Sequence, residues 1–106
     1  MEAAIALLYA ENEAKKRNKT LEWKIREFSM DGNMVREITP INDDVYIVIS
    51  GDSDVMVSSE TGVYNKPSAP EYQHVHQGHI TLTNVANSPK RMRFLQAMFL
   101  KTELKN

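Results

Sequence analysis

The spacing of apolar residues in this chain changes at Thr20. Residues 1 to 18 are rich in strong helix formers and carry acid–base pairs four positions apart, such as Glu11 and Lys15. After Thr20 the run LEWKIR alternates apolar and polar residues one by one, which is typical of a half-buried strand. The sequence therefore predicts a helix over residues 1 to 18 and β-structure after it.

The rest of the chain reads as a series of strands. VYIVIS, residues 45 to 50, is apolar on both faces, as in a central strand covered on two sides. Further strands are expected at VMVSS after the turn GDSD, over residues 71 to 84 and over residues 90 to 100. A chain of 106 residues suffices for one hydrophobic core. We expect a single domain over residues 1 to 106: a mainly β fold, a small antiparallel β-sandwich or partly open barrel of about six strands over residues 21 to 100, with an N-terminal α-helix.

Turn chemistry and strand register predict two hairpins. The dipeptide Asp-Gly at 31–32 is a common two-residue hairpin turn, and centring it sets Phe28 opposite Val35 and Glu27 opposite Arg36. The turn VANSP would join the last two strands, and residues 71 to 84 would then form one continuous strand. Its opposing pairs would be Asn84–Lys90, Leu82–Met92, Ile80–Phe94 and His76–Met98.

All three histidines lie within EYQHVHQGHITLTN. On a strand, His74 and His76 point to the same side about 7 Å apart, which lets two imidazoles reach one ion. His79 has the opposite parity and joins them only if a β-bulge forms at Gly78. Three interpretations stay open: a metal site of His74, His76 and His79, a strand with buried or interfacial histidines, and an octahedral metal clasp built by His-x-His pairs from three copies.

Nothing in the sequence indicates catalysis, and we expect neither an enzyme nor a cofactor. Cupin-like enzymes follow a His-x-His pair with an acid and a later third histidine, and here both of those ligands are missing. Motifs for nucleophiles, phosphate loops and zinc proteases are absent, and without cysteine there is no thiolate site. The alternative to a non-catalytic protein is a small cupin-like barrel that binds a metal or small ligand through His74 and His76.

Charge and hydropathy argue against other partners. Residues 37 to 71 contain seven acids and one base, whereas residues 72 to 106 contain five bases and one acid. The pI near 6.3 and the acidic middle do not suit nucleic-acid binding through Lys90, Arg91, Arg93 and Phe94. AAIALLYA is too short to span a bilayer and leads into no cleavage site, so we expect no membrane anchor and no signal peptide.

The block HQGHITLTNVANSPKRMRFLQAMF resembles the terminal hairpin of small virion proteins of tailed bacteriophages. The resemblance lies in the glycine, the I-x-L-x-N strand, the Ser/Pro turn and the basic strand ending in Phe-x-Gln, over 24 of 106 residues. It implies a decoration, cement or tail component without an active site, working as a homo-oligomer within a particle. We expect the partners to be further copies and other structural proteins, and the location to be the virion or the cytoplasm. The N-terminal helix matches none of its motifs, and no residue carries over as a functional one.

The chain also has features that suit assembly. Six methionines can adapt to irregular contacts, and the helix is apolar at its start. We expect interface contacts from Ile5, Leu8 and Tyr9 on the helix, from Pro67 and Pro70 in a loop, and from the histidine-bearing strand. The leading expectation is therefore a structural or assembly protein.

Overall fold

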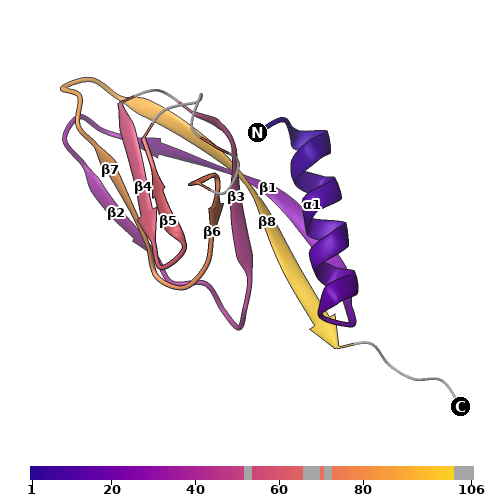
Figure 1. Cartoon of the computed structure of the whole chain (residues 1–106). Coiled ribbons are helices and arrows are strands. Elements are labelled where there is room, and N and C mark those ends of the chain that lie inside the picture. The colour runs from indigo at the N-terminus through magenta and orange to yellow at the C-terminus, as the bar shows by residue number, and fades with distance from the viewer. Residues whose placement is uncertain (52–53, 66–69, 71–72, 102–106) are drawn as a thin grey trace, which may run out of the picture.

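The computed structural model of the protein describes residues 1–51, 54–65, 70 and 73–101 (Figure 1). The elements of this part of the chain are α1 (Ala3–Lys16), β1 (Lys19–Met30), β2 (Val35–Ile38), β3 (Val45–Gly51), β4 (Val55–Ser59), β5 (Gly62–Tyr64), β6 (Val75–His76), β7 (Ile80–Asn84) and β8 (Lys90–Lys101). The strands form two antiparallel sheets, ordered β1-β8-β3-β6 and β2-β7-β4-β5. The predicted mainly β sandwich with an N-terminal helix is confirmed, and the sheets do not close into a barrel.

The molecule has three layers, because α1 covers the outer face of the first sheet (Figure 1). One core lies between the two sheets, and a second core lies between α1 and the first sheet. The central strand β3 contributes to both: Tyr46 and Val48 belong to the core between the sheets, and Val45 and Ile47 to the core under the helix. The two-sided apolar pattern of VYIVIS thus has the cause that the sequence predicts.

Three alanines attach the helix to its sheet. Ala6, Ala10 and Ala14 stand four residues apart, share one face of α1 and are buried. Their small side chains let the helix backbone approach the sheet closely. Among the described residues, no helix has the length and apolar character needed to cross a bilayer.

β1 and β8 form the longest strand pair, with Lys19 opposite Lys101 at one end and Met30 opposite Lys90 at the other. Only part of this pair lies in the sandwich, where Phe28 and Met30 enter the core between the sheets. The remainder runs outward beside α1 and gives the molecule principal extents of 57 × 24 × 21 Å (Figure 1). We call this extension, made of α1, residues 19–25 and residues 95–101, the wing.

The predicted hairpin at residues 31–32 is wrong. β1 pairs with β8 and β2 pairs with β7, so the chain changes sheet at this turn. Phe28 therefore does not pair with Val35, and Glu27 lies opposite Arg93 rather than Arg36. β8 carries its own alternation and basic residues, and it matches β1 over a longer stretch than β2 can.

The predicted pairing of the last two strands is also wrong. β7 pairs with β2 and β4, and Leu82 and Ile80 face Met92 and Phe94 across the core instead of within one sheet. His76 lies opposite Tyr46, not Met98. The alternation therefore identified the buried faces correctly but not the partners.

Residues 71 to 84 are not one continuous strand. The chain leaves the first sheet after β6 and enters the second sheet at β7, turning at Gly78, whose φ is 72°. Glycine adopts this left-handed conformation without the steric cost that other residues incur. Asn84 holds the corner at the other end of β7: its Nδ2 donates to the carbonyls of Met30, Asp31 and Ser88.

Candidate functional site

His74 is buried and lies next to Met1 in space. Its Nδ1 lies 3.1 Å from the N-terminal nitrogen of Met1 and 3.4 Å from the carbonyl oxygen of Val48. Its ring meets Tyr64 edge to face at a centroid distance of 4.9 Å. These contacts make His74 a link between the chain start, β3 and the second sheet.

His76 is completely buried on β6. Ser59 Oγ lies 2.7 Å from its Nδ1, and Nε2 has no hydrogen-bond partner among the described residues. Burial lowers the pKa of His76 to about 4, so the ring is neutral near pH 7. A serine beside a histidine can act as a nucleophile, but here Ser59 also lies 3.0 Å from Thr61 Oγ1, which donates to the Val75 carbonyl. The hydrogen-bonded pair of Ser59 and His76 therefore joins β4 of the second sheet to β6 of the first.

His79 occupies a third, exposed environment. Its Nε2 lies 3.3 Å from a carboxylate oxygen of Glu37, and its Nδ1 lies 3.2 Å from the hydroxyl of Thr39. The turn at Gly78 separates it from the other two imidazoles. Within the described part of the chain, no three histidine, cysteine, aspartate or glutamate side chains come together in a way that could hold a metal ion.

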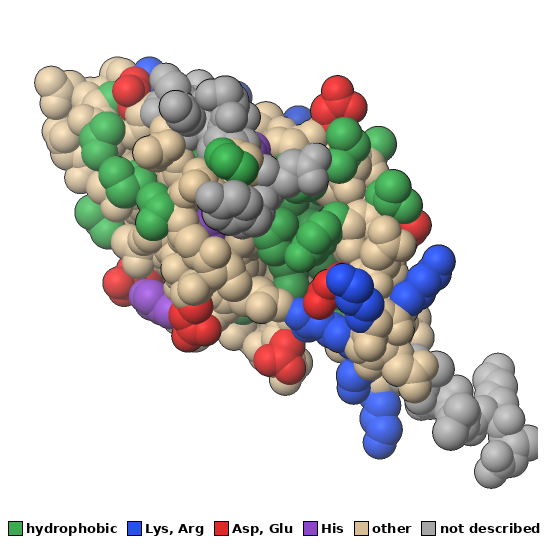
Figure 2. Space-filling model, viewed as in Figure 1, with side chains coloured by type: hydrophobic (Ala, Val, Ile, Leu, Met, Phe, Trp, Pro, Cys, Tyr) green, Lys and Arg blue, Asp and Glu red, His purple; other side chains and the backbone are tan. Residues whose placement is uncertain are grey.

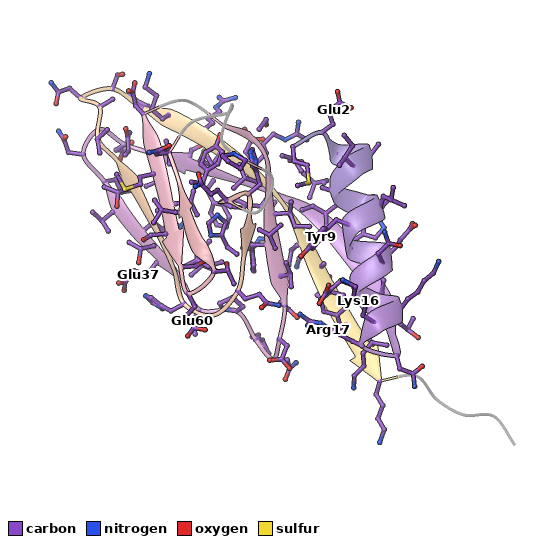
Figure 3. All side chains as sticks on the ribbon, viewed as in Figure 1. Glu2, Tyr9, Lys16, Arg17, Glu37 and Glu60 are labelled. Atoms are coloured by element: carbon purple, nitrogen blue, oxygen red, sulfur yellow. The ribbon has the colours of Figure 1, made fainter. Side chains whose placement is uncertain are left out.

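A cleft of about 520 Å³ lies between the wing and the sandwich. It is lined by Arg17, Lys19, Asn42, Asp43, Asp44, Glu60, Gln77 and Gly78. Figure 3 shows Arg17 and Glu60 on its opposite sides. Arg17 already binds the Asp43 carbonyl and lies over the Phe99 ring, and Asp44 accepts a hydrogen bond from Gln96. The lining mixes both signs of charge, and Arg17 and Asp44 are already engaged within the chain, so its charges do not point to one class of ligand.

The basic run on β8 is divided between the surface and the core. Lys90 lies 3.4 Å from Asp54, and Arg91 lies 3.7 Å from Glu27. Phe94 is completely buried between the sheets, where it meets Phe28 and Tyr46 edge to face, so it cannot stack on a base. The aromatic residue that the nucleic-acid interpretation needs is therefore not on the surface.

The predicted helix contacts lie on the surface. Ile5, Leu8 and Tyr9 stand at i, i+3 and i+4, share one side of α1, and are 44%, 57% and 40% exposed. Figure 2 shows hydrophobic side chains over the N-terminal half of α1 and between the helix and the sandwich. Pro70 is exposed, and Pro67 lies outside the described residues.

One exposed feature was missed by the sequence analysis. Trp23 and Ile25, expected on the buried face of a strand, are 47% and 37% exposed on β1. β1 is an edge strand of its sheet, so its outer side has no neighbouring strand among those described. The signal that the sequence offers is the pair of charged residues Glu22 and Lys24 on either side of Trp23, because edge strands commonly carry charged side chains. No protein-family model, curated protein or solved structure matches the chain.

Proposed function

We propose that this chain is a non-catalytic structural protein that works as a homo-oligomer, as a decoration or tail component of a bacteriophage particle does. The observation that supports the proposal best is the exposed apolar side of α1 formed by Ile5, Leu8 and Tyr9. Scattered exposed apolar residues are normal, but three that share one side of a helix form a surface suited to another protein.

The attachment of α1 supports the same proposal. The helix is held mainly by Ala6, Ala10 and Ala14, which bury little area each, and by the partly buried Leu7. Its other large apolar side chains, Ile5, Leu8 and Tyr9, are exposed. A helix that served only its own core would place the larger side chains inward. The resemblance of residues 76 to 99 to the terminal hairpin of phage virion proteins is the reason for proposing a bacteriophage particle.

The buried histidines have the contacts of structural residues and not those of a ligand-binding site. His74 and His76 connect the chain start, β3 and the second sheet, and each has contacts within the chain. Both rings are buried within the described part of the chain, at 3% and 0% exposed, whereas a ligand-binding site needs a side chain that a ligand can reach. We therefore place the function on the surface of the molecule.

Sedimentation velocity at protein concentrations from about 1 to about 100 µM, which detects association with a dissociation constant in the micromolar range (about −8 kcal/mol at 1 µM), tests the proposal. We expect the wild-type chain to sediment as an oligomer, and the variant Ile5→Ser/Leu8→Ser/Tyr9→Ser to shift toward the monomer with its circular dichroism unchanged. The control is Ile41→Ser, which removes an apolar side chain that is 75% exposed in the loop between β2 and β3 and should leave the mass unchanged.

Two results would contradict the proposal. The first is a wild-type chain that stays monomeric over the whole concentration range, because the proposal requires a homo-oligomer. A monomer that binds a divalent ion stoichiometrically in a metal analysis, and loses the ion on His74→Ala, would favour the metal-binding alternative.

A further inference from the structure

The outer edge of β1 offers a long backbone surface. β1 has β8 as its only neighbour among the described strands, although it is as long as β8. An edge strand presents unpaired N–H and C=O groups that can pair with another chain. The wing part of this edge also carries the exposed side chains of Trp23 and Ile25.

The hydrogen bonding of the sheet tells which residues of β1 face that edge. Val48 donates its N–H to the His74 carbonyl at 2.8 Å, so its backbone groups point away from Phe94 on β8. Phe94 therefore directs its own backbone groups toward Arg26 on β1. By alternation, the even-numbered residues of β1 bond β8, and the odd-numbered residues, Trp23 among them, direct their backbone groups outward.

We propose that two copies of this chain pair through β1, antiparallel, with a twofold axis at Trp23, so that two four-stranded sheets become one. This inference rests on the proposed homo-oligomer and names one of its interfaces. In a symmetric antiparallel pair, opposite residues lie on the same face of the joined sheet, so the axis must pass through a residue. Only a few registers are therefore possible.

The register centred on Trp23 gives the apolar and the charged side chains of the wing segment complementary partners. Trp23 meets Trp23 of the second copy, and Leu21 meets Ile25 in both directions on the face that carries α1. On the other face Glu22 meets Lys24 twice. Further along, on the face that carries α1, Lys19 meets Glu27. Among the described residues, neither Glu22 nor Lys24 has an ion-pair partner within its own chain.

The neighbouring registers are worse. An axis at Glu22 opposes two glutamates, and an axis at Lys24 opposes two lysines. An axis at Ile25 sets Lys24 against Arg26 twice. An axis at Leu21 opposes no like charges, but it sets Glu22 against Thr20 and Lys24 against Asn18, so both charges lose their opposite-charge partners. The charges of this strand thus favour the Trp23 register over its neighbours.

Cross-linking tests the register directly, because the chain contains no cysteine. Residues directly opposite in an antiparallel pair have Cα atoms about 4.5–5.5 Å apart, which a disulfide can span. We expect Trp23→Cys to give a covalent dimer on mild oxidation. Ile25→Cys is the matched control, since the two copies of residue 25 would be about 13 Å apart along the strands and should not join.

A second variant covers the case in which loss of Trp23 weakens association. Leu21→Cys/Ile25→Cys keeps the tryptophan and places the two thiols of each copy opposite those of the other. The two cysteines of one chain are too far apart along the strand to join each other, so any disulfide is intermolecular. We expect a dimer joined by two disulfides.

Charge exchange gives an independent test without covalent chemistry. Lys24→Glu would oppose glutamates at two places and should weaken dimerisation about tenfold, as expected for replacing two favourable cross-strand pairs by two like-charge pairs. Glu22→Lys/Lys24→Glu restores both pairs in the Trp23 register alone and should recover the wild-type dissociation constant within about twofold.

The outcomes separate this inference from the proposed function. If the wild-type chain is an oligomer but neither cysteine variant cross-links and the double exchange does not rescue Lys24→Glu, the β1 pairing is wrong and the homo-oligomer stands. If Ile25→Cys joins as readily as Trp23→Cys, the register is wrong. If the wild-type chain is monomeric at all concentrations, both proposals fail.

Discussion

At the scale of single residues, His76 couples the stability of the fold to pH. The ring is completely buried, and burial lowers its pKa from an ordinary value near 6.5 to about 4. Between these values the unfolded chain binds a proton that the folded chain excludes, so folding loses stability as the pH falls. The stabilisation is complete above about pH 6.5.

We therefore expect the free energy of unfolding to fall by about 3 kcal/mol as the pH decreases from about 6.5 to 4, because each pH unit between the two pKa values corresponds to about 1.4 kcal/mol. His76→Asn should flatten this dependence, because the amide has no proton to take up in that range. Urea denaturation at several pH values measures the slope. His79→Asn, at an exposed position, is the control and should keep it. A wild-type slope that survives in His76→Asn would assign the effect to another group.

At the scale of elements, the sequence predicted types and faces better than partners. Alternation places Phe94 and Leu82 on buried faces, and the structure confirms both positions. Alternation repeats on every strand, however, so it cannot choose between β2 and β8 as the neighbour of β1. The choice depends on the whole sandwich, in which β8 offers β1 the longer match.

The exposed apolar surface was predicted only in part, because alternation shows which face a residue lies on and not which element covers that face. Ile5, Leu8 and Tyr9 could be placed on an apolar helix end, and they lie exposed on α1. Trp23 was expected to be buried because its strand looks half-buried, yet its exposure depends on where α1 stops covering the sheet. The turn at Gly78 separates His79 from His74 and His76. A glycine in the sequence does not by itself indicate whether a strand bulges, ends or continues.

The attachment of α1 gives a prediction at this scale. Ala10 is 1% exposed against the sheet, so Ala10→Leu forces extra methylene groups into a packed contact. We expect it to reduce the free energy of unfolding by about 1–3 kcal/mol in urea denaturation. Asn12→Leu adds the same side chain at an exposed position of the same helix and should change stability by no more than about 0.5 kcal/mol. Equal effects of the two variants would show that α1 does not depend on close packing.

At the scale of the whole molecule, the wing and the sandwich have different roles. The sandwich encloses the larger core, whereas the wing carries both the exposed side of α1 and the edge of β1. An axis at Trp23 places two wings side by side and the two sandwiches at opposite ends of the joined sheet. The helices then lie on the same face of that sheet, and each copy keeps its sandwich available for further contacts.

Hydrogen exchange can detect this arrangement in the unmodified protein. The amides of Leu21, Trp23 and Ile25 direct their N–H groups at the open edge, so they should exchange freely in the monomer and become protected as the dimer forms. We expect their exchange, followed by NMR or mass spectrometry, to slow as protein concentration rises. The amides of β2, an edge strand of the second sheet, serve as the internal control because the joined sheet leaves them unchanged. Protection that rises on β2 and not on β1, while the mass doubles, would move the interface to the other sheet and leave the wing as a surface for a different partner.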